Sequence, residues 1–141
     1  MGIEENKSKV QGYVEDILNN QNYDKYEDYF ADDFVGEGGN ILGKEGHIQS
    51  FKNRRLRMPD LHFENKDMIA EGNRVFALQQ ISGTMNSGST KGKYAEWLVA
   101  NIYEFRDGKI IAGGARVSDS LGVLQQLGVL PSAEEIQKKM E

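Results

Sequence analysis

The spacing of apolar residues changes near residue 60, and this change constrains the fold more than any other feature. Before it, apolar positions recur every three or four residues, as in VQGYVEDIL at residues 10–18, which is the period of an amphipathic helix. After it, apolar and polar residues alternate, as half-buried strands do. Helices first and strands afterwards predict an α+β fold, in which helices pack on one face of a curved antiparallel sheet.

Three helices are predicted in the first half of the chain. They cover residues 3–20, 23–34 and 44–57. In the third helix, Ile48, Phe51 and Leu56 are expected to face inward, and Pro59 ends it. The basic run KNRRLR at residues 52–57 is interpreted as a solvated helix face.

Four strands are predicted in the second half, separated by the hairpin signals EGN, NSGSTKGK and RDG. They cover residues 61–70, 74–84, 94–105 and 109–117. Asp119 is expected to cap a short helix, and SAEE at residues 132–135 is a capping box for a last one. With no repeat and no linker, residues 1–141 are interpreted as a single domain.

Composition excludes several classes of function. The formal net charge of -5 argues against nucleic-acid binding, because phosphate contacts need a basic face. The chain has no cysteine, and its two histidines, His47 and His62, are too few for a histidine-built metal site. The loop NSGSTKGK lies between two strands, where no helix N-terminus can receive a phosphate. We therefore expect no metal, no nucleotide and no other cofactor.

No apolar run approaches the roughly 20 residues that cross a bilayer, so no membrane span is expected. The start, MGIEENKSKV, is charged and lacks the apolar centre of a signal peptide. These two observations predict a cytoplasmic protein.

Five stretches in register carry a resemblance to a known family. They are ADDFVGEGG, GKEGHIQSF, MPDLHFENKDMIAEGNRV, IYEFRDGKI and DSLGVLQQLGVLP. In this order and spacing, from about residue 7 to about residue 131, the chain resembles the SnoaL-like polyketide cyclases, also described as predicted ester cyclases. The resemblance implies the nuclear-transport-factor-2-like fold, a cone of helices and a curved sheet.

The resemblance also implies a chemistry. Cyclases of this type close a ring by aldol chemistry without metal or cofactor, using an Asp on the last strand and a His on the strand before. Alignment on FRDGKI and DSLG places that Asp at Arg116 and that His at Asn101. A Trp that many relatives carry before the Asp falls at Ala115, and a His that many carry after DFV falls at Glu37. The resemblance therefore implies a retained scaffold with a rewritten pocket.

Strand alternation indicates which side chains face the cone. If Asn101 points inward, so does Arg116 on the next strand, and the two are expected to stabilise developing negative charge. Glu37, on the segment that crosses the mouth, is the candidate base. The expected catalytic residues are thus Glu37, Arg116 and Asn101. The expected substrate-binding residues are Tyr13, His47, Phe51, Trp97 and Tyr103.

Each candidate also has a structural interpretation. Glu37 is equally well a solvent-exposed loop carboxylate, and Arg116 equally well pairs with a nearby acid. Asn101 needs hydrogen-bond partners inside a sheet, so its role can be structural. Trp97 is more often part of a core than a surface for stacking a ligand. His47 can lie on the surface of its helix.

Two functions of different classes remain open. The first is a cofactor-free acid/base enzyme acting on a small hydrophobic carbonyl compound as a cyclase, isomerase or lyase. The second is a non-catalytic cone that binds a small molecule through Trp97 and tyrosines. An epoxide hydrolase is a weaker alternative, because its Asp–Arg–Asp set lacks a second inward Asp beside Arg116. A homodimer is expected through Leu98, Ala100 and Ile102, which face away from the cone.

Overall fold

The computed structural model describes residues 2–36 and 43–141. The helical segments are α1 (Ile3–Tyr13), the π-helix η1 (Val14–Asn19), the 3₁₀ turn η2 (Tyr23–Lys25), α2 (Tyr26–Tyr29), α3 (Gly43–Arg57), the 3₁₀ turn η4 (Gly88–Thr90), α4 (Ser120–Gln126) and α5 (Ala133–Lys139). The strands are β1 (Phe30–Gly36), β2 (His62–Glu71), β3 (Arg74–Thr84), β4 (Tyr94–Arg106) and β5 (Lys109–Ser118). No helix in these ranges is both long enough and apolar enough to span a bilayer.

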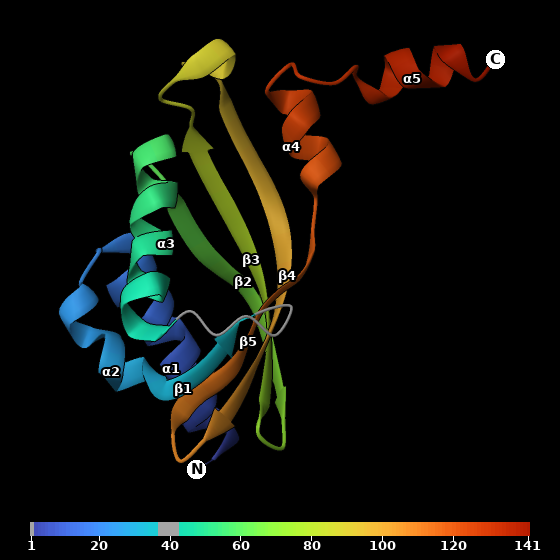
Figure 1. Cartoon of the computed structure of the whole chain (residues 1–141). Coiled ribbons are helices and arrows are strands. Elements are labelled where there is room, and N and C mark those ends of the chain that lie inside the picture. The colour runs from blue at the N-terminus through green and yellow to red at the C-terminus, as the bar shows by residue number, and fades with distance from the viewer. Residues whose placement is uncertain (1, 37–42) are drawn as a thin grey trace.

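The five strands form one curved sheet in the order β1-β5-β4-β3-β2. Strands β2 to β5 are the predicted antiparallel meander, and their bounds agree with the prediction to within one residue. The N-terminal helices cover one face of this sheet, and α3 stands opposite β2, β3 and β4 (Figure 1). The predicted α+β cone is therefore confirmed.

Strand β1 was not predicted, and the helix expected over residues 23–34 is wrong beyond Tyr29. The chain turns there from the short helix α2 into β1, which pairs in parallel with β5. Phe30 lies opposite Ile110, and both side chains are buried. Because these two residues lie about 80 positions apart in the sequence, no local pattern predicts their contact. Tertiary packing here overrides the weak helical spacing of residues 30–34.

The first helical segment carries the predicted apolar face, and all its members are buried: Val10, Tyr13, Val14, Ile17 and Leu18. Its second half is a π-helix. The wider turn includes one more residue than an α-helical turn, so it changes which side chains follow one another on a face.

Helix α3 begins at Gly43 and ends at Arg57, close to the prediction. Phe51 is buried and Ile48 is half-buried, but Leu56 is 70% exposed, so the prediction that Leu56 faces inward is wrong. At 3.6 residues per turn, Leu56 lies about 140° around the helix from Phe51. The buried face of α3 instead includes His47.

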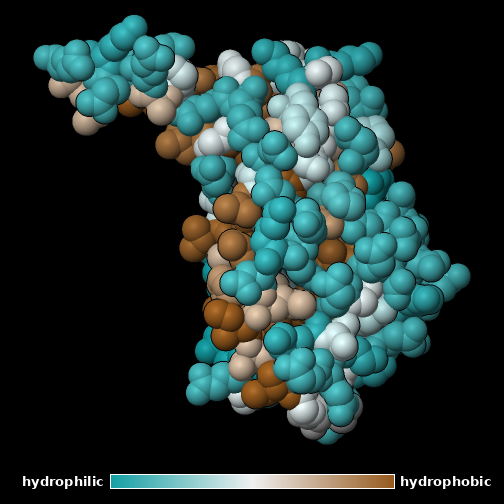
Figure 2. Space-filling model, turned by 180° about the vertical axis from the view of Figure 1, so that it is seen from behind, coloured by the Kyte–Doolittle hydropathy of each residue, from teal (hydrophilic) through white to brown (hydrophobic). Residues whose placement is uncertain are grey.

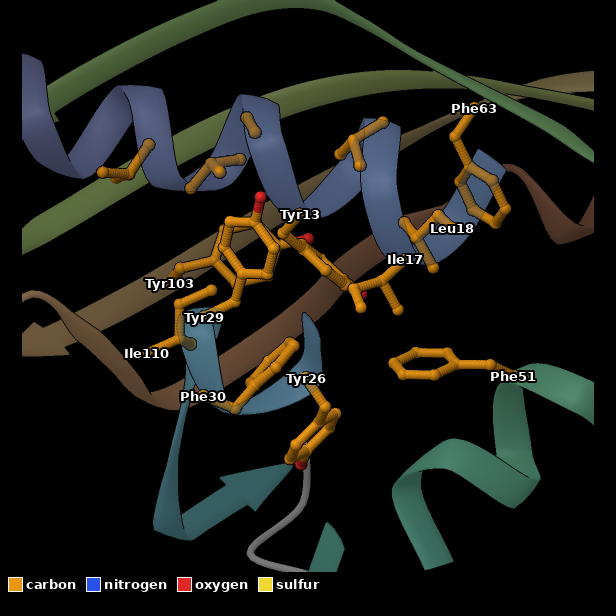
Figure 3. Packing of buried hydrophobic residues seen from close by; sticks show 14 of the residues in the cluster. Tyr13, Ile17, Leu18, Tyr26, Tyr29, Phe30, Phe51, Phe63, Tyr103 and Ile110 are labelled. Atoms are coloured by element: carbon orange, nitrogen blue, oxygen red, sulfur yellow. The ribbon is translucent and has the colours of Figure 1, made fainter. Parts of the chain in front are cut away.

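An aromatic core fills the narrow end of the cone, where α1, β1, α3 and the sheet converge (Figure 3). Tyr13 is at its centre: its ring is 4.9 Å from that of Phe30 and 6.0 Å from that of Tyr103, both in edge-to-face geometry. Such pairs prefer this arrangement because the ring edge is positive and the face negative. The core thus closes one end and leaves open space toward α4.

Candidate functional site

Two adjoining cavities, each of about 240 Å³, lie between α3, the sheet and α4. The inner cavity is lined by Tyr13, Leu18, Arg54, Phe63, Gln79, Ile81, Trp97, Val99, Asn101, Tyr103, Ala115 and Ser118. The outer cavity is lined by Arg54, Arg57, Met58, Leu61, Phe63, Ile81, Met85, Trp97, Val123 and Leu127. Four residues belong to both, so the two cavities share a wall at Arg54, Phe63, Ile81 and Trp97.

The predicted alternation of β4 is confirmed. Trp97, Val99, Asn101 and Tyr103 line the inner cavity, whereas Leu98, between them, is 44% exposed on the other face. This follows from the two-residue period of a strand, which gives each face every second side chain. The sequence therefore placed this wall of the cavity correctly.

Polar groups of the inner cavity are held by the sheet. The amide nitrogen of Asn101 donates to the carbonyl oxygens of Ala77 and Val99, each at 3.3 Å. The Gln79 amide nitrogen lies 3.4 Å from the Tyr103 hydroxyl, to which it donates. With Nδ2 bound to the backbone, the Asn101 side chain has a fixed orientation, and its carbonyl oxygen accepts no hydrogen bond from the described residues.

The two cavity tyrosines remain neutral phenols. Burial raises the pKa of Tyr13 to about 12. Burial, with a smaller effect of Tyr13, raises the pKa of Tyr103 far above its ordinary value. A neutral phenol can donate a hydrogen bond to an anionic oxygen but cannot act as a base near neutral pH.

Arg116 does not follow the alternation used to predict its direction. Ala115 pairs with Asn101 and Val117 pairs with Ala100, so Arg116 is the extra residue of a β-bulge. Ala115 lines the inner cavity, whereas Arg116 is exposed and belongs to the lining of neither cavity. The inward direction expected for Arg116 is therefore corrected: the bulge interrupts the two-residue period.

His47 and Phe51 lie in the aromatic core behind the cavities rather than in either lining. The His47 ring stacks on Phe34 with centroids 4.7 Å apart, and its Nδ1 is 2.8 Å from the Tyr26 hydroxyl oxygen. Burial, and secondly the charge of Arg54, lower the pKa of His47 to about 4. His47 is thus a neutral core residue.

The candidate base Glu37 lies outside the described residues. Within residues 2–36 and 43–141, no Asp or Glu lines either cavity, and no three His, Asp or Glu side chains are grouped as metal ligands. The basic run is largely exposed, as predicted, but its member Arg54 also lines both cavities, and sequence reasoning missed that second role. The available signal was its position three residues after Phe51, on the same side of α3.

Comparison with known proteins identifies the family. The sequence model of the SnoaL-like polyketide cyclases matches residues 8–127, and the chain belongs to this family. Membership supports a cyclase-like function. A search of curated proteins finds no match.

Solved structures share the fold at low sequence identity. AclR, a proposed hydroxylase from Streptomyces galilaeus, has a TM-score of 0.82 at 20% identity, over 99% of this chain and 95% of its own. A proposed polyketide cyclase from Acidithiobacillus ferrooxidans has a TM-score of 0.78 at 22% identity, over 91% and 98%. IdmH, a proposed polyketide cyclase from Streptomyces antibioticus, also has a TM-score of 0.78 at 22% identity, over 88% and 99%.

Proposed function

We propose that this protein is a cofactor-free acid/base enzyme that moves a proton next to the carbonyl group of a small hydrophobic molecule. The observation that carries the proposal is the inner cavity, where apolar walls surround Asn101, Gln79 and Tyr103. Removal of a proton beside a carbonyl leaves negative charge on oxygen, which fixed hydrogen-bond donors stabilise best where water is scarce. Cyclase, isomerase and lyase reactions share this step. Trp97 offers a flat face against which a planar substrate packs.

The base in this proposal is Glu37, and the choice rests on the sequence alone. Since no described carboxylate lines either cavity, a side-chain base of this type has to come from residues 37–42, and Glu37 is the only acid among them. Arg116, next to the cavity residue Ala115, is proposed to assist in stabilising negative charge.

Exchange of the acidic α-protons of 2-tetralone, a flat bicyclic ketone, for deuterium tests the proposal. Proton NMR in D₂O follows the exchange, which the protein is expected to accelerate over buffer. Glu37→Gln keeps the shape of the side chain but removes the base, so the protein-catalysed rate should fall by about a hundredfold. Tyr103→Phe removes a phenol donor of the inner cavity and should cost about a hundredfold as well, whereas the amide donors of Asn101 are already bound to the carbonyl oxygens of Ala77 and Val99.

Glu45→Gln is the matched control, because Glu45 is exposed on α3 and lines neither cavity. It should leave the exchange rate unchanged, and circular dichroism should show an intact fold for every variant. A rate for Glu37→Gln within a few-fold of the wild-type rate would show that Glu37 is not the base.

A non-catalytic binding cone is the second candidate function. It is favoured by one specific observation, the lack of any carboxylate in the cavity linings within the described ranges. Binding of 2-tetralone, seen as a change in the fluorescence of the single tryptophan, Trp97, without faster exchange would favour this function. An epoxide hydrolase needs two Asp side chains around a water, and neither cavity supplies one from the described residues.

We further propose that two copies pair through the outer strip, a name used here for Leu98, Ala100, Ile102 and Val117. Val117 is 69% exposed and Leu98 is 44% exposed. An exposed apolar strip of this kind favours an interface. Helix α5 does not cover it within one chain, because α5 projects away from the body (Figure 1).

A further inference from the structure

Arg54 differs from the arginine beside it. Arg55 donates from Nη1 to the carbonyl oxygens of Leu61 and Pro59 and from Nη2 to that of Leu18, at 2.5, 3.3 and 2.5 Å, and so joins α3 to neighbouring segments. Arg54 has no hydrogen bond and no ion pair with any described residue. Its recorded contact is with the Phe51 ring, whose centroid lies 5.6 Å from the guanidinium carbon. The hydrogen bonds of Arg55 thus hold α3 against neighbouring segments, whereas the N–H donors of Arg54 remain available to a ligand.

The Phe51 ring directs Arg54 rather than neutralising it. A guanidinium over an aromatic face is attracted by the ring but keeps its in-plane N–H donors. Phe51 is buried and reaches from α3 toward the core (Figure 3), so the ring is a fixed support. Arg54 is held as a cation at the wall that the two cavities share.

The rest of the inner cavity suits an anion. Its polar side chains on the sheet, Gln79, Asn101, Tyr103 and Ser118, are all neutral, and no acid from the described residues would repel a negative ligand. The positive charge of Arg54 reaches this wall, since it lowers the pKa of both Tyr13 and Tyr103 against the larger opposing effect of burial. Arg57 adds a second cation at the outer cavity.

We propose that Arg54 binds the carboxylate of a planar, aromatic-sized ligand whose apolar body packs against Trp97 in the inner cavity. A carboxylate matches the two parallel donors of a guanidinium, and this bidentate pairing adds direction as well as attraction. The inference deepens the proposed function, on which it rests for the choice of a small-molecule ligand: it assigns an acidic group to the substrate and a specificity-determining role to Arg54.

Binding of 2-naphthoate and 2-naphthamide, measured by isothermal titration calorimetry at pH 7, tests the proposal. The two probes share the same flat body, and only naphthoate is charged. We expect wild-type protein to bind naphthoate about tenfold or more tightly than naphthamide, and added salt to reduce the difference. In Arg54→Gln this preference should disappear. Arg54→Met, which keeps an apolar stem against Phe51, should show the same loss if the charge is what matters.

Lys52→Gln is the matched control. Lys52 is exposed on the same helix and lines neither cavity, so its removal changes the net charge by the same amount without touching the site. The preference for naphthoate should persist in it. The proposal is overturned if wild-type protein binds neither probe, if it shows no preference, if either Arg54 variant keeps the preference, or if Lys52→Gln loses as much of it.

The proposed function is judged separately. Exchange of 2-tetralone by the wild-type protein reports on proton transfer and uses a neutral ligand. Faster exchange without a preference for naphthoate would refute the role of Arg54 alone. A preference that Arg54 controls, without faster exchange, would leave the anion site standing and refute the enzyme.

Discussion

His47 shows how strongly a single position depends on what surrounds it. Its ring is enclosed by Phe34, Phe30 and Phe51, and the Tyr26 hydroxyl meets its Nδ1. Protonation would place a charge among aromatic rings close to Arg54, which is why the pKa falls to about 4. The sequence offered a histidine on a helix and could not distinguish a ligand from a core residue.

Stability should therefore depend on pH through His47. In the unfolded chain the imidazole titrates near 6.5, so between pH 6.5 and 4 the unfolded state binds a proton that the folded state does not. The stabilisation is fully present above pH 6.5 and is lost as the pH falls toward 4. Between pH 7 and pH 5, urea unfolding should show a loss in wild type about 2 kcal/mol larger than in His47→Gln. Equal losses in the two proteins would contradict the assignment.

At the scale of elements, the close approach of β4 explains why the middle of β5 carries glycine instead of a larger residue. Gly113 has φ +131°, and a Cβ there would collide with the Ile102 carbonyl oxygen and lie 2.8 Å from Tyr103 Cα. The strand passes between β4 and β1 at this point, paired with Tyr103 on one side and Gly36 on the other. Three residues later, the bulge at Arg116 interrupts the pairing of β5 with β4 before α4 begins.

Gly113→Ala should consequently destabilise the protein by about 3 kcal/mol or more, because backbone strain and a backbone clash act together. Gly72→Ala is the matched change: Gly72 has φ +59°, but nothing lies within 4 Å of the position its Cβ would take, so only the conformational cost of about 1 kcal/mol applies. Chemical unfolding of the two variants measures the difference. Similar losses in both would show that β5 has room for a side chain at residue 113.

At the scale of the whole molecule, the helices cover one face of the sheet and leave the other open. Hydrophobic surface runs along one side of the body, below the projecting C-terminal arm (Figure 2). Leu98 and Val117 of the outer strip are exposed, and Leu121, Val129 and Leu130 add exposed apolar side chains on the segment that leads to α5. In the dimer proposed above, the outer strip is the surface that the second copy covers.

Light scattering after size exclusion should give the mass of a dimer at micromolar concentration. Leu98→Glu places like charges on both sides of a two-fold interface and should raise the dimer dissociation constant by about tenfold or more. Leu56→Glu is the control, because Leu56 is 70% exposed on α3, away from the outer strip. A wild-type monomer, or equal weakening by both changes, would refute this interface.

The sequence by itself determined what depends on neighbours along the chain. The period of two residues placed the inner wall of β4 correctly, from Trp97 to Tyr103. The capping patterns were also right, since Asp119 accepts from the Gly122 amide and Ser132 from the Glu135 amide. Side-chain spacing and caps act within a few residues, so a linear pattern records them.

Only the tertiary structure decided what depends on residues far apart. Strand β1 exists because Phe30 packs beside Ile110, and Arg116 is exposed because a bulge absorbs a mismatch between β4 and β5. Arg54 faces the cavities while Arg55 ties α3 to the chain near Leu18. These outcomes follow from how elements meet in space, because close packing fixes each side chain by partners that local periodicity does not specify.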